Sequence, residues 1–315
     1  MMIFNNTTSS PSTFLLTAFP GLELAHVWIS IPVCCLYIIA LLGNTMILFV
    51  IFVKQRLHKP MYYFLSMLSA ADLCLTITTL PTVLGVLWFH AREISIKACL
   101  IQMFFVHAFS FLESSVLAIM AFDRFMAICN PLKYATILKD MMILAIGLFI
   151  CVRQLIFIFP MLLALKTVSF QERKELSHPF CYHPDIIRDT YSNPWINSFL
   201  GLFLQLYMTG TDLMFILVSY VLIIRAVLNI VAPKKQKKAL NTCVCHICAV
   251  TIFYVPMISL VICSILANVY LLLPPVLNPI IYSLKTRTIR QAMLQLLQTK
   301  GSWSRNVRGL RGSWD

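Results

Sequence analysis

Residues 120–134 of this chain read MAFDRFMAICNPLKY, and the rest of the sequence is best interpreted outward from them. An apolar run of helical length leads into this stretch and ends at two adjacent charges, Asp123 and Arg124. Such charges at a membrane boundary are costly unless they contact water, each other or a partner. Pro131 then interrupts the helix, and Lys133 marks the cytoplasmic side. The stretch therefore predicts the inner end of a membrane-spanning helix.

The composition places the whole chain in a lipid bilayer. Of the 315 residues, 59% are hydrophobic and only 12% are charged, which is too apolar for a soluble domain of this length. The net charge of +13 is compatible with nucleic acid, but the basic residues lie in short segments between apolar runs. Positive cytoplasmic loops account better for this pattern, so we expect no nucleic-acid partner.

Seven apolar runs reach the length of about 20 residues that a membrane-spanning helix needs. They are Trp28–Val53, Tyr62–Trp88, Ala98–Cys129, Met141–Leu165, Ile196–Val231, Leu240–Cys263 and Ile265–Ser283. Most of the 25 lysine and arginine residues then fall in segments on one side, which places the N-terminus outside and the C-terminus inside. The expected fold is all-α, a seven-transmembrane helix bundle over residues 28–285, with an outer segment 1–27 and a cytoplasmic tail 286–315.

Both ends of the chain carry short signals. Residues 1–22 lack the basic start and the long apolar run of a cleavable signal peptide, so we expect the first span to direct insertion. Asn5 and Asn6 each begin an Asn-x-Thr sequon, which predicts N-glycosylation of an N-terminus that lies outside. The apolar spacing in Thr288–Leu297 predicts a short amphipathic helix along the membrane.

Polar side chains deep inside the predicted spans are candidates for function, because burial in lipid is costly for them. Glu113 shares a face of the third span with Arg124, about three turns away. The full set of deep carboxylates and amides is Asn44, Asp72, Glu113, Asp212 and Asn278. They predict either a proton or ion pathway or a hydrated cluster that packs differently in two states. The lack of a regular relay favours the cluster, and a sodium ion is a candidate occupant at Asp72 and Glu113.

A second set of residues points to a ligand pocket in the outer half of the bundle. His107 lies in the third span, a turn before Ser110 and Phe111. It is either a histidine satisfied within the bundle or the polar anchor of an otherwise apolar pocket, and both interpretations stay open. The residues of the fifth and sixth spans that could line the same pocket are Gln205, Met208, Tyr254 and Met257.

The cysteines predict one disulfide and no metal site. Cys99, at the outer start of the third span, and Cys181, in the long outer loop, face an oxidising compartment and are expected to pair. Four residues of the sixth span resemble metal ligands in composition: Cys243, Cys245, His246 and Cys248. Their offsets scatter them around a helix, so we expect no metal or other cofactor. The sequence also lacks a phosphate loop, a nucleophile elbow and an HExxH motif, so we expect no enzyme activity.

Several motifs follow one another in a specific order along the chain. They are Gly43-Asn44, PMYYFL at 60–65 ahead of Asp72, the stretch 120–134, Ser219-Tyr220, KALNTC at 238–243, FYVP at 253–256 and PPVLNPIIY at 274–282. In this order they resemble the odorant receptors, specifically the class I or fish-like branch of the rhodopsin-like G-protein-coupled receptors. The resemblance covers most of Phe14 to Leu297.

This resemblance implies a receptor that binds a small volatile or acidic organic ligand within the bundle. The receptor would activate a stimulatory, olfactory-type heterotrimeric G protein and raise cyclic AMP, from the plasma membrane of olfactory sensory cilia. Arg124 would then leave Asp123 to meet the G protein, while Tyr220 and Tyr282 move toward it. Asp72 and Glu113 would form the ion-sensitive centre, and the disulfide would hold the outer loop over the pocket.

The chain also departs from the family pattern. Gln171 and Tyr191 stand where such receptors often carry a second outer disulfide, and Cys245 replaces a serine. The stretch between Pro256 and Asn268 is clearly shorter than in class I receptors. Two alternatives to a signalling receptor therefore stay open: a receptor-derived protein that exports or signals poorly, and an ion channel or transporter that uses the buried carboxylates.

Overall fold

The structure of the chain is a computed structural model. It describes residues 13–17, 26–166, 168, 175–188 and 194–230, followed by 232–234, 236–237, 239–240, 243–244, 246–255 and 257–258. The chain divides into two units, Met1–Val250 and Thr251–Asp315, and each is considered by itself. Several predictions lie outside the described residues, namely the sequons at Asn5 and Asn6, the seventh span with Asn278 and Tyr282, and the amphipathic helix Thr288–Leu297.

Five long helices form the first unit. They are α1 (His26–Val53), α2 (Pro60–Trp88), α3 (Ile96–Cys129), α5 (Asp140–Lys166) and α7 (Pro194–Leu228), and each is long and apolar enough to cross a membrane. They match the first five predicted spans to within three residues at either end. A shorter apolar helix, His246–Val255, falls inside the sixth predicted span.

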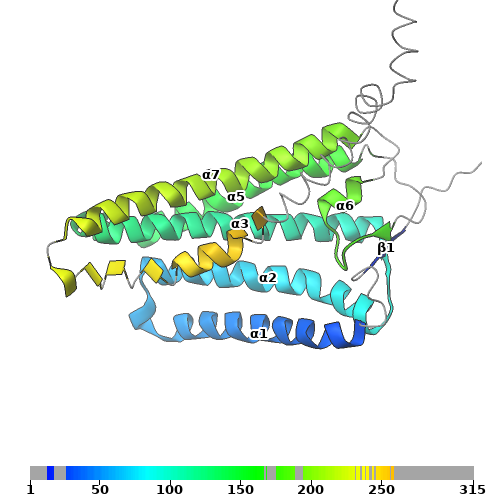
Figure 1. The fold of residues 1–315 in the computed structure, drawn as a ribbon, viewed down its shortest axis with the longest axis horizontal. Coiled ribbons are helices and arrows are strands. Elements are labelled where there is room, and N and C mark those ends of the chain that lie inside the picture. Colours follow the sequence, from blue (N-terminus) through cyan, green and yellow to red (C-terminus); the bar gives the residue numbers. More distant parts are fainter. Residues whose placement is uncertain are drawn as a thin grey trace, which may run out of the picture. The chain divides into compact units, whose positions relative to one another are not determined.

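α3 is the central helix of the first unit. It packs against α2, α5 and α7, while α1 packs against α2 (Figure 1). Of the most apolar stretch of α3, 61% is buried, compared with 6% for α1. Because α1 exposes large apolar side chains along its length, it presents the kind of surface that suits lipid.

Helix ends follow local sequence signals. The Ser95 hydroxyl caps α3 by accepting a hydrogen bond from the Ala98 amide at 3.3 Å. α3 ends at Cys129, and Pro131 then starts the short helix α4 (Pro131–Ile137), which confirms the predicted interruption. On the same side of the bundle, the 3₁₀ helix η2 (Gln55–Leu57) joins α1 to α2.

A small sheet covers the outer end of the helices, in addition to the expected all-α bundle. Its order is β2 (Glu93–Ser95), β1 (Thr13–Leu16) and β3 (Glu175–Leu176), with β1 antiparallel to β2 and parallel to β3. Phe14 and Leu16 alternate inward from β1 and are 0% and 1% exposed. The outer N-terminal segment thus supplies the middle strand, which the sequence pattern did not indicate.

The sheet and the helices share one apolar core. Phe14 and Leu16 of β1 belong to the same cluster of buried side chains as residues of the bundle, among them Val83, Cys99, Met103, Phe111, Cys181 and Met208. The short helix α6 (His183–Ile187), next to Cys181, contributes Ile186 and Ile187 to this cluster. The outer end of the bundle is therefore a packed region that joins elements far apart in the sequence.

Candidate functional site

The predicted disulfide is present and fixes the outer loop over α3. The Cα atoms of Cys99 and Cys181 lie 5.4 Å apart. Gln102, one turn further along α3, accepts a hydrogen bond from the Cys181 amide at 2.9 Å. Its side-chain amide donates to the Thr78 carbonyl and the Thr82 hydroxyl at 2.9 and 2.8 Å, which ties the same point to α2. The residues after Cys181 are therefore held close to the third span.

His107 lies directly beneath this loop. Its Nδ1–H donates to the Met103 carbonyl at 2.9 Å, so the neutral ring carries its lone pair on Nε2. The ring stacks on Tyr182 with centroids 5.8 Å apart and meets the edge of Phe111 at 6.2 Å. One nitrogen is thus satisfied within the bundle, and the other is an acceptor among aromatic rings. Ser110 is half-buried on the same helix.

His183 is a further member of this site that the sequence analysis did not identify. Its ring lies 6.2 Å from that of His107 and is 4% exposed. The imidazole packs on the backbone of α7 at Gly201, where an added Cβ would lie 2.4 Å from Cε1 of His183. Burial, with a smaller contribution from His107, lowers the pKa of His183 to about 3, so the ring is neutral at physiological pH.

The other predicted ligand residues divide between the two units. Met208 of α7 is fully buried in the outer apolar cluster together with Phe111. Gln205 lies on the same helix and is half-buried. Tyr254 and Met257 belong to the second unit, in which the rings of Phe253 and Tyr254 meet edge to face at 5.0 Å. Among the candidates on the first unit, Phe111 and Met208 belong to one apolar cluster, and the ring of His107 contacts that of Phe111.

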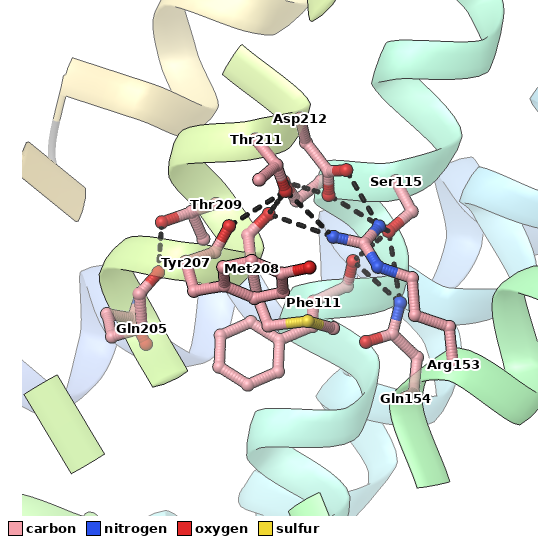
Figure 2. A network of polar contacts seen from close by, with 11 residues as sticks. Phe111, Ser115, Arg153, Gln154, Gln205, Tyr207, Met208, Thr209, Thr211 and Asp212 are labelled. Atoms are coloured by element: carbon pink, nitrogen blue, oxygen red, sulfur yellow. Dashed lines mark hydrogen bonds and ion pairs between the residues drawn. The ribbon is translucent and has the colours of Figure 1, made fainter. Parts of the chain in front are cut away.

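A buried ion pair lies one helical turn further inward. Nη1 of Arg153 on α5 is 2.7 Å from Oδ1 of Asp212 on α7 (Figure 2). The side chains of Ser114 and Ser115 on α3 both donate to Oδ2 of Asp212 at 3.0 Å. Three helices therefore meet at this carboxylate, with two serine donors and one guanidinium around it.

The remaining donors of this network reach both backbone carbonyls and side-chain hydroxyls. Nη2 of Arg153 donates to the Met208 carbonyl at 3.2 Å and to the Thr211 hydroxyl at 3.0 Å (Figure 2). The amide of Gln154 donates to the Ser115 hydroxyl at 3.0 Å and is 3.4 Å from the Phe111 carbonyl. From the sequence Asp212 is expected to belong with Asp72 and Glu113, but its partners in the structure are Arg153 and the two serines.

Asp72 of α2 and Glu113 of α3 lie next to each other. Their carboxyl groups are within hydrogen-bonding reach of each other, and the Asn44 side chain reaches Asp72. The Asn44 amide also donates to the Ala40 carbonyl at 3.1 Å. Oε1 of Glu113 is buried and has no hydrogen-bond partner among the described residues. Two adjacent carboxyls of this kind require a shared proton or a cation.

At the inner end, Asp123 is 1% exposed and has two partners. Tyr134 of α4 donates from its hydroxyl to Oδ1 at 2.8 Å, and Nη2 of Arg124 is 3.5 Å from Oδ2. Burial and the hydrogen bond to Asp123 raise the pKa of Tyr134, so its hydroxyl stays protonated and remains a donor. This arrangement holds Arg124 beside Asp123.

Tyr220 and His246 make a second contact at this end of the bundle. The Tyr220 hydroxyl is 2.6 Å from Nδ1 of His246, and the rings stack at 5.8 Å. Nε2 of His246 lies 3.1 Å from the Leu117 carbonyl. Because a carbonyl only accepts, Nε2 carries the hydrogen and Nδ1 accepts from Tyr220. Among the described residues, no group of three or more His, Cys, Asp or Glu side chains could hold a metal ion.

Comparison with known proteins places these features in a family. A sequence model described as olfactory receptor matches residues 33–300. The chain is similar to olfactory receptor 51T1 of Homo sapiens, with 76% identity covering all of both chains, and to olfactory receptor 51F1 of Homo sapiens, with 54% identity over 95% of this chain and 98% of the relative.

Proposed function

This chain belongs to the olfactory receptor family, within its class I branch, and on this premise we propose that it detects a small odorant and signals through a stimulatory G protein. It is a multi-pass seven-helix receptor of the plasma membrane and not an enzyme. In the proposed signalling sequence, the odorant binds in the outer half of the bundle and favours the conformation that binds the olfactory-type G protein. The activated G protein then raises cyclic AMP. The proposed location is the cilia of olfactory sensory neurons.

The observation that carries the ligand proposal is the pairing of two buried imidazoles, His107 and His183. Both lie in an apolar and aromatic surrounding, and the pKa of His183, at about 3, keeps its ring neutral. A neutral imidazole can exchange hydrogen bonds with a hydroxyl or carbonyl, but it supplies no positive charge to a carboxylate. We therefore infer a mostly apolar odorant with one neutral polar group rather than an acidic one.

The inner end supports the proposal for G-protein coupling. Asp123 holds Arg124 from one side, and Tyr220 is held by His246 from another helix. These contacts could be exchanged when α3 and α7 shift relative to each other, which would free Arg124 for a partner. The acidic pair Asp72 and Glu113, with Asn44 beside it, would bind a sodium ion in the resting conformation.

The test is cyclic AMP output from transfected cells that carry an N-terminally tagged receptor, over panels of alcohols, ketones and carboxylic acids. We expect responses to neutral odorants, loss of the response in Arg124→Ala at unchanged surface number, and a normal response in Arg225→Ala, which removes an exposed arginine of α7. A wild-type receptor that reaches the surface and responds to no odorant would contradict the proposal.

Two other outcomes identify the alternatives. A tag that stays inside the cell would indicate a receptor-derived protein that exports poorly, and a family-length stretch inserted after Cys263 should then restore export. An ionic current that disappears in Asp72→Asn would indicate a channel. Surface labelling comes first, because every signalling measurement depends on the receptor reaching the surface.

A further inference from the structure

The network around Arg153 lies directly behind residues of the candidate ligand site. Ser115 follows Phe111 by one helical turn on α3, and Asp212 follows Met208 by one turn on α7. Phe111 and Met208 are buried in the outer apolar cluster that also contains Cys181. The polar groups that join the three helices are therefore next to the inner boundary of the site.

The network also bonds to the backbone of these same two residues. Arg153 donates to the Met208 carbonyl at 3.2 Å, and the Ser115 hydroxyl, which lies 3.0 Å from both the Phe111 carbonyl and Oδ2 of Asp212, shares its one hydrogen between them (Figure 2). In an α-helix each of these carbonyls already accepts one bond from the residue four positions later. The Arg153 bond reaches Met208 from α5, whereas the Ser115 bond stays within α3. The link between the turns that carry Phe111 and Met208 therefore runs through Arg153, which contacts the Met208 carbonyl, Asp212 and the Ser115 hydroxyl.

The charged groups of this network are fully engaged, whereas Oε1 of Gln154, at its edge, has no hydrogen-bond partner among the described residues. Asp212 accepts from one guanidinium and two hydroxyls, and its side chain is 8% exposed. Arg153, at 17% exposed, uses both terminal nitrogens. In a low-dielectric surrounding, moving α5 or α7 would separate opposite charges, and moving α3 would break the serine bonds to Asp212. The spacing of the three helices at this level is therefore strongly constrained.

We propose that Arg153 is a positioning residue for odorant selectivity: through Asp212, Ser115 and the Met208 carbonyl it sets the distance between the Phe111 and Met208 turns. This inference rests on the proposed function. It goes beyond it by assigning selectivity to a residue of α5 that has no place in the ligand site itself. Loss of the network should therefore change which odorants fit, and not only how many receptors reach the surface.

Two variants keep the chain free of an unpaired buried charge. Arg153→Lys retains the ion pair with Asp212, but an ammonium cannot reproduce the planar fork that reaches Ser115, Thr211 and the Met208 carbonyl together. The double variant Arg153→Met with Asp212→Leu removes both charges at similar volume, which is usually tolerated. Arg225→Lys makes the same chemical change at an exposed position of α7 and is the matched control.

The measurement is the half-maximal concentration for cyclic AMP, per surface receptor, for straight-chain alcohols and ketones of increasing length. We expect both network variants to shift it by at least about fivefold and to change the order of preference among chain lengths, while Arg225→Lys changes neither. Network variants with wild-type concentrations and order would overturn this inference alone. Retention of both variants inside the cell would assign the network to folding and overturn it too. A wild type that responds to no odorant would overturn the proposed function, and with it this inference.

Discussion

Two buried carboxylate sites lie near the middle of the helices, and they are built in opposite ways. Asp212 faces a guanidinium and two hydroxyl donors, so its charge is balanced and its oxygens are occupied. Glu113 faces another acid, Asp72, and keeps one oxygen without a partner among the described residues. A balanced network has one low-energy arrangement, whereas an acidic pair depends on a proton or a cation. The first is suited to fixing geometry and the second to changing state.

The most direct test of this difference removes one carboxylate from each site. Asp212→Ala leaves Arg153 as an unpaired cation inside the membrane, which costs about 3–5 kcal/mol and should reduce surface labelling of a tagged receptor at least about tenfold. Glu113→Gln removes one of two adjoining acids, so surface labelling should stay near that of the wild type. Equal losses in the two variants would show that the sites do not differ in this respect.

A second test concerns the outer side of the ligand site. It asks whether the uncharged contact between His183 and Gly201 fixes the site as firmly as the Arg153–Asp212 ion pair does. Gly201→Ala would place a Cβ 2.4 Å from the ring of His183, whereas Gly210→Ala, on the same helix, meets nothing within 4 Å. We expect the first to raise the half-maximal odorant concentration about five- to thirtyfold, corresponding to overpacking of about 1–2 kcal/mol, and the second to leave it unchanged. Adding His183→Ala to Gly201→Ala should make the glycine change neutral. An additive loss in that double variant would place the effect elsewhere.

The third test concerns the cation that the acidic pair is proposed to hold. Replacing extracellular sodium by a bulky organic cation should lower the half-maximal odorant concentration of the wild type about fivefold, because the resting state loses its ion. Glu113→Gln should abolish this sodium dependence, while Arg153→Lys should retain it. Sodium dependence that survives in Glu113→Gln would separate the ion from the acidic pair.

The smallest effect is expected at the pair of His178 and Asp185, in which the histidine can titrate. His178 lies against Asp185 in the outer loop, with Tyr182 and Arg188 nearby, and the hydrogen bond that its Nδ1–H donates to Asp185 raises the pKa of His178. Because the folded pKa is raised, this pair stabilises the loop fully below about pH 6.5, and the contribution is lost as pH rises through the folded value. Odorant potency should therefore weaken less than about threefold above that range.

The control for this pH dependence is His90, a histidine on the same outer side of the membrane. His178→Gln should flatten the profile, and His90→Gln, at an exposed position after α2, should leave it as in the wild type. A profile that is unchanged in His178→Gln would assign the pH response to another group. The small size follows from the partial exposure of His178, since solvent screens the pair.

The helical part of the fold could be predicted because lipid imposes a simple rule on the sequence. Predominantly apolar runs of sufficient length had to be spans, so the limits of α1, α2, α3, α5 and α7 were predicted to within three residues. β1 could not be predicted in this way. Thr13–Leu16 is too short for a clear alternation, and its partners near residues 94 and 176 are distant in sequence. Pairing of that kind depends on three-dimensional proximity alone.

The site was predictable where one helix carries the pattern and less so where several helices meet. His107 and Phe111 share a face of α3, and the structure keeps them together. His183 was missed although it follows Cys181 by two residues, and the expected disulfide already placed that segment above α3. Arg153 and Asp212 lie 59 residues apart, but opposite charges near the middle of two spans could have suggested a pair.

The position of β1 in the middle of the sheet also determines how late during synthesis the sheet can be completed. The strand leaves the ribosome first, yet one neighbour follows about 80 residues later and the other about 160 residues later. Phe14 and Leu16 must therefore wait on the far side of the membrane while four spans are inserted. β3 and Cys181 arrive within the same short segment, so strand completion and disulfide formation become possible at the same moment. Although β1 is translated before the five long helices, its pairing is thus completed only after four of them have been inserted.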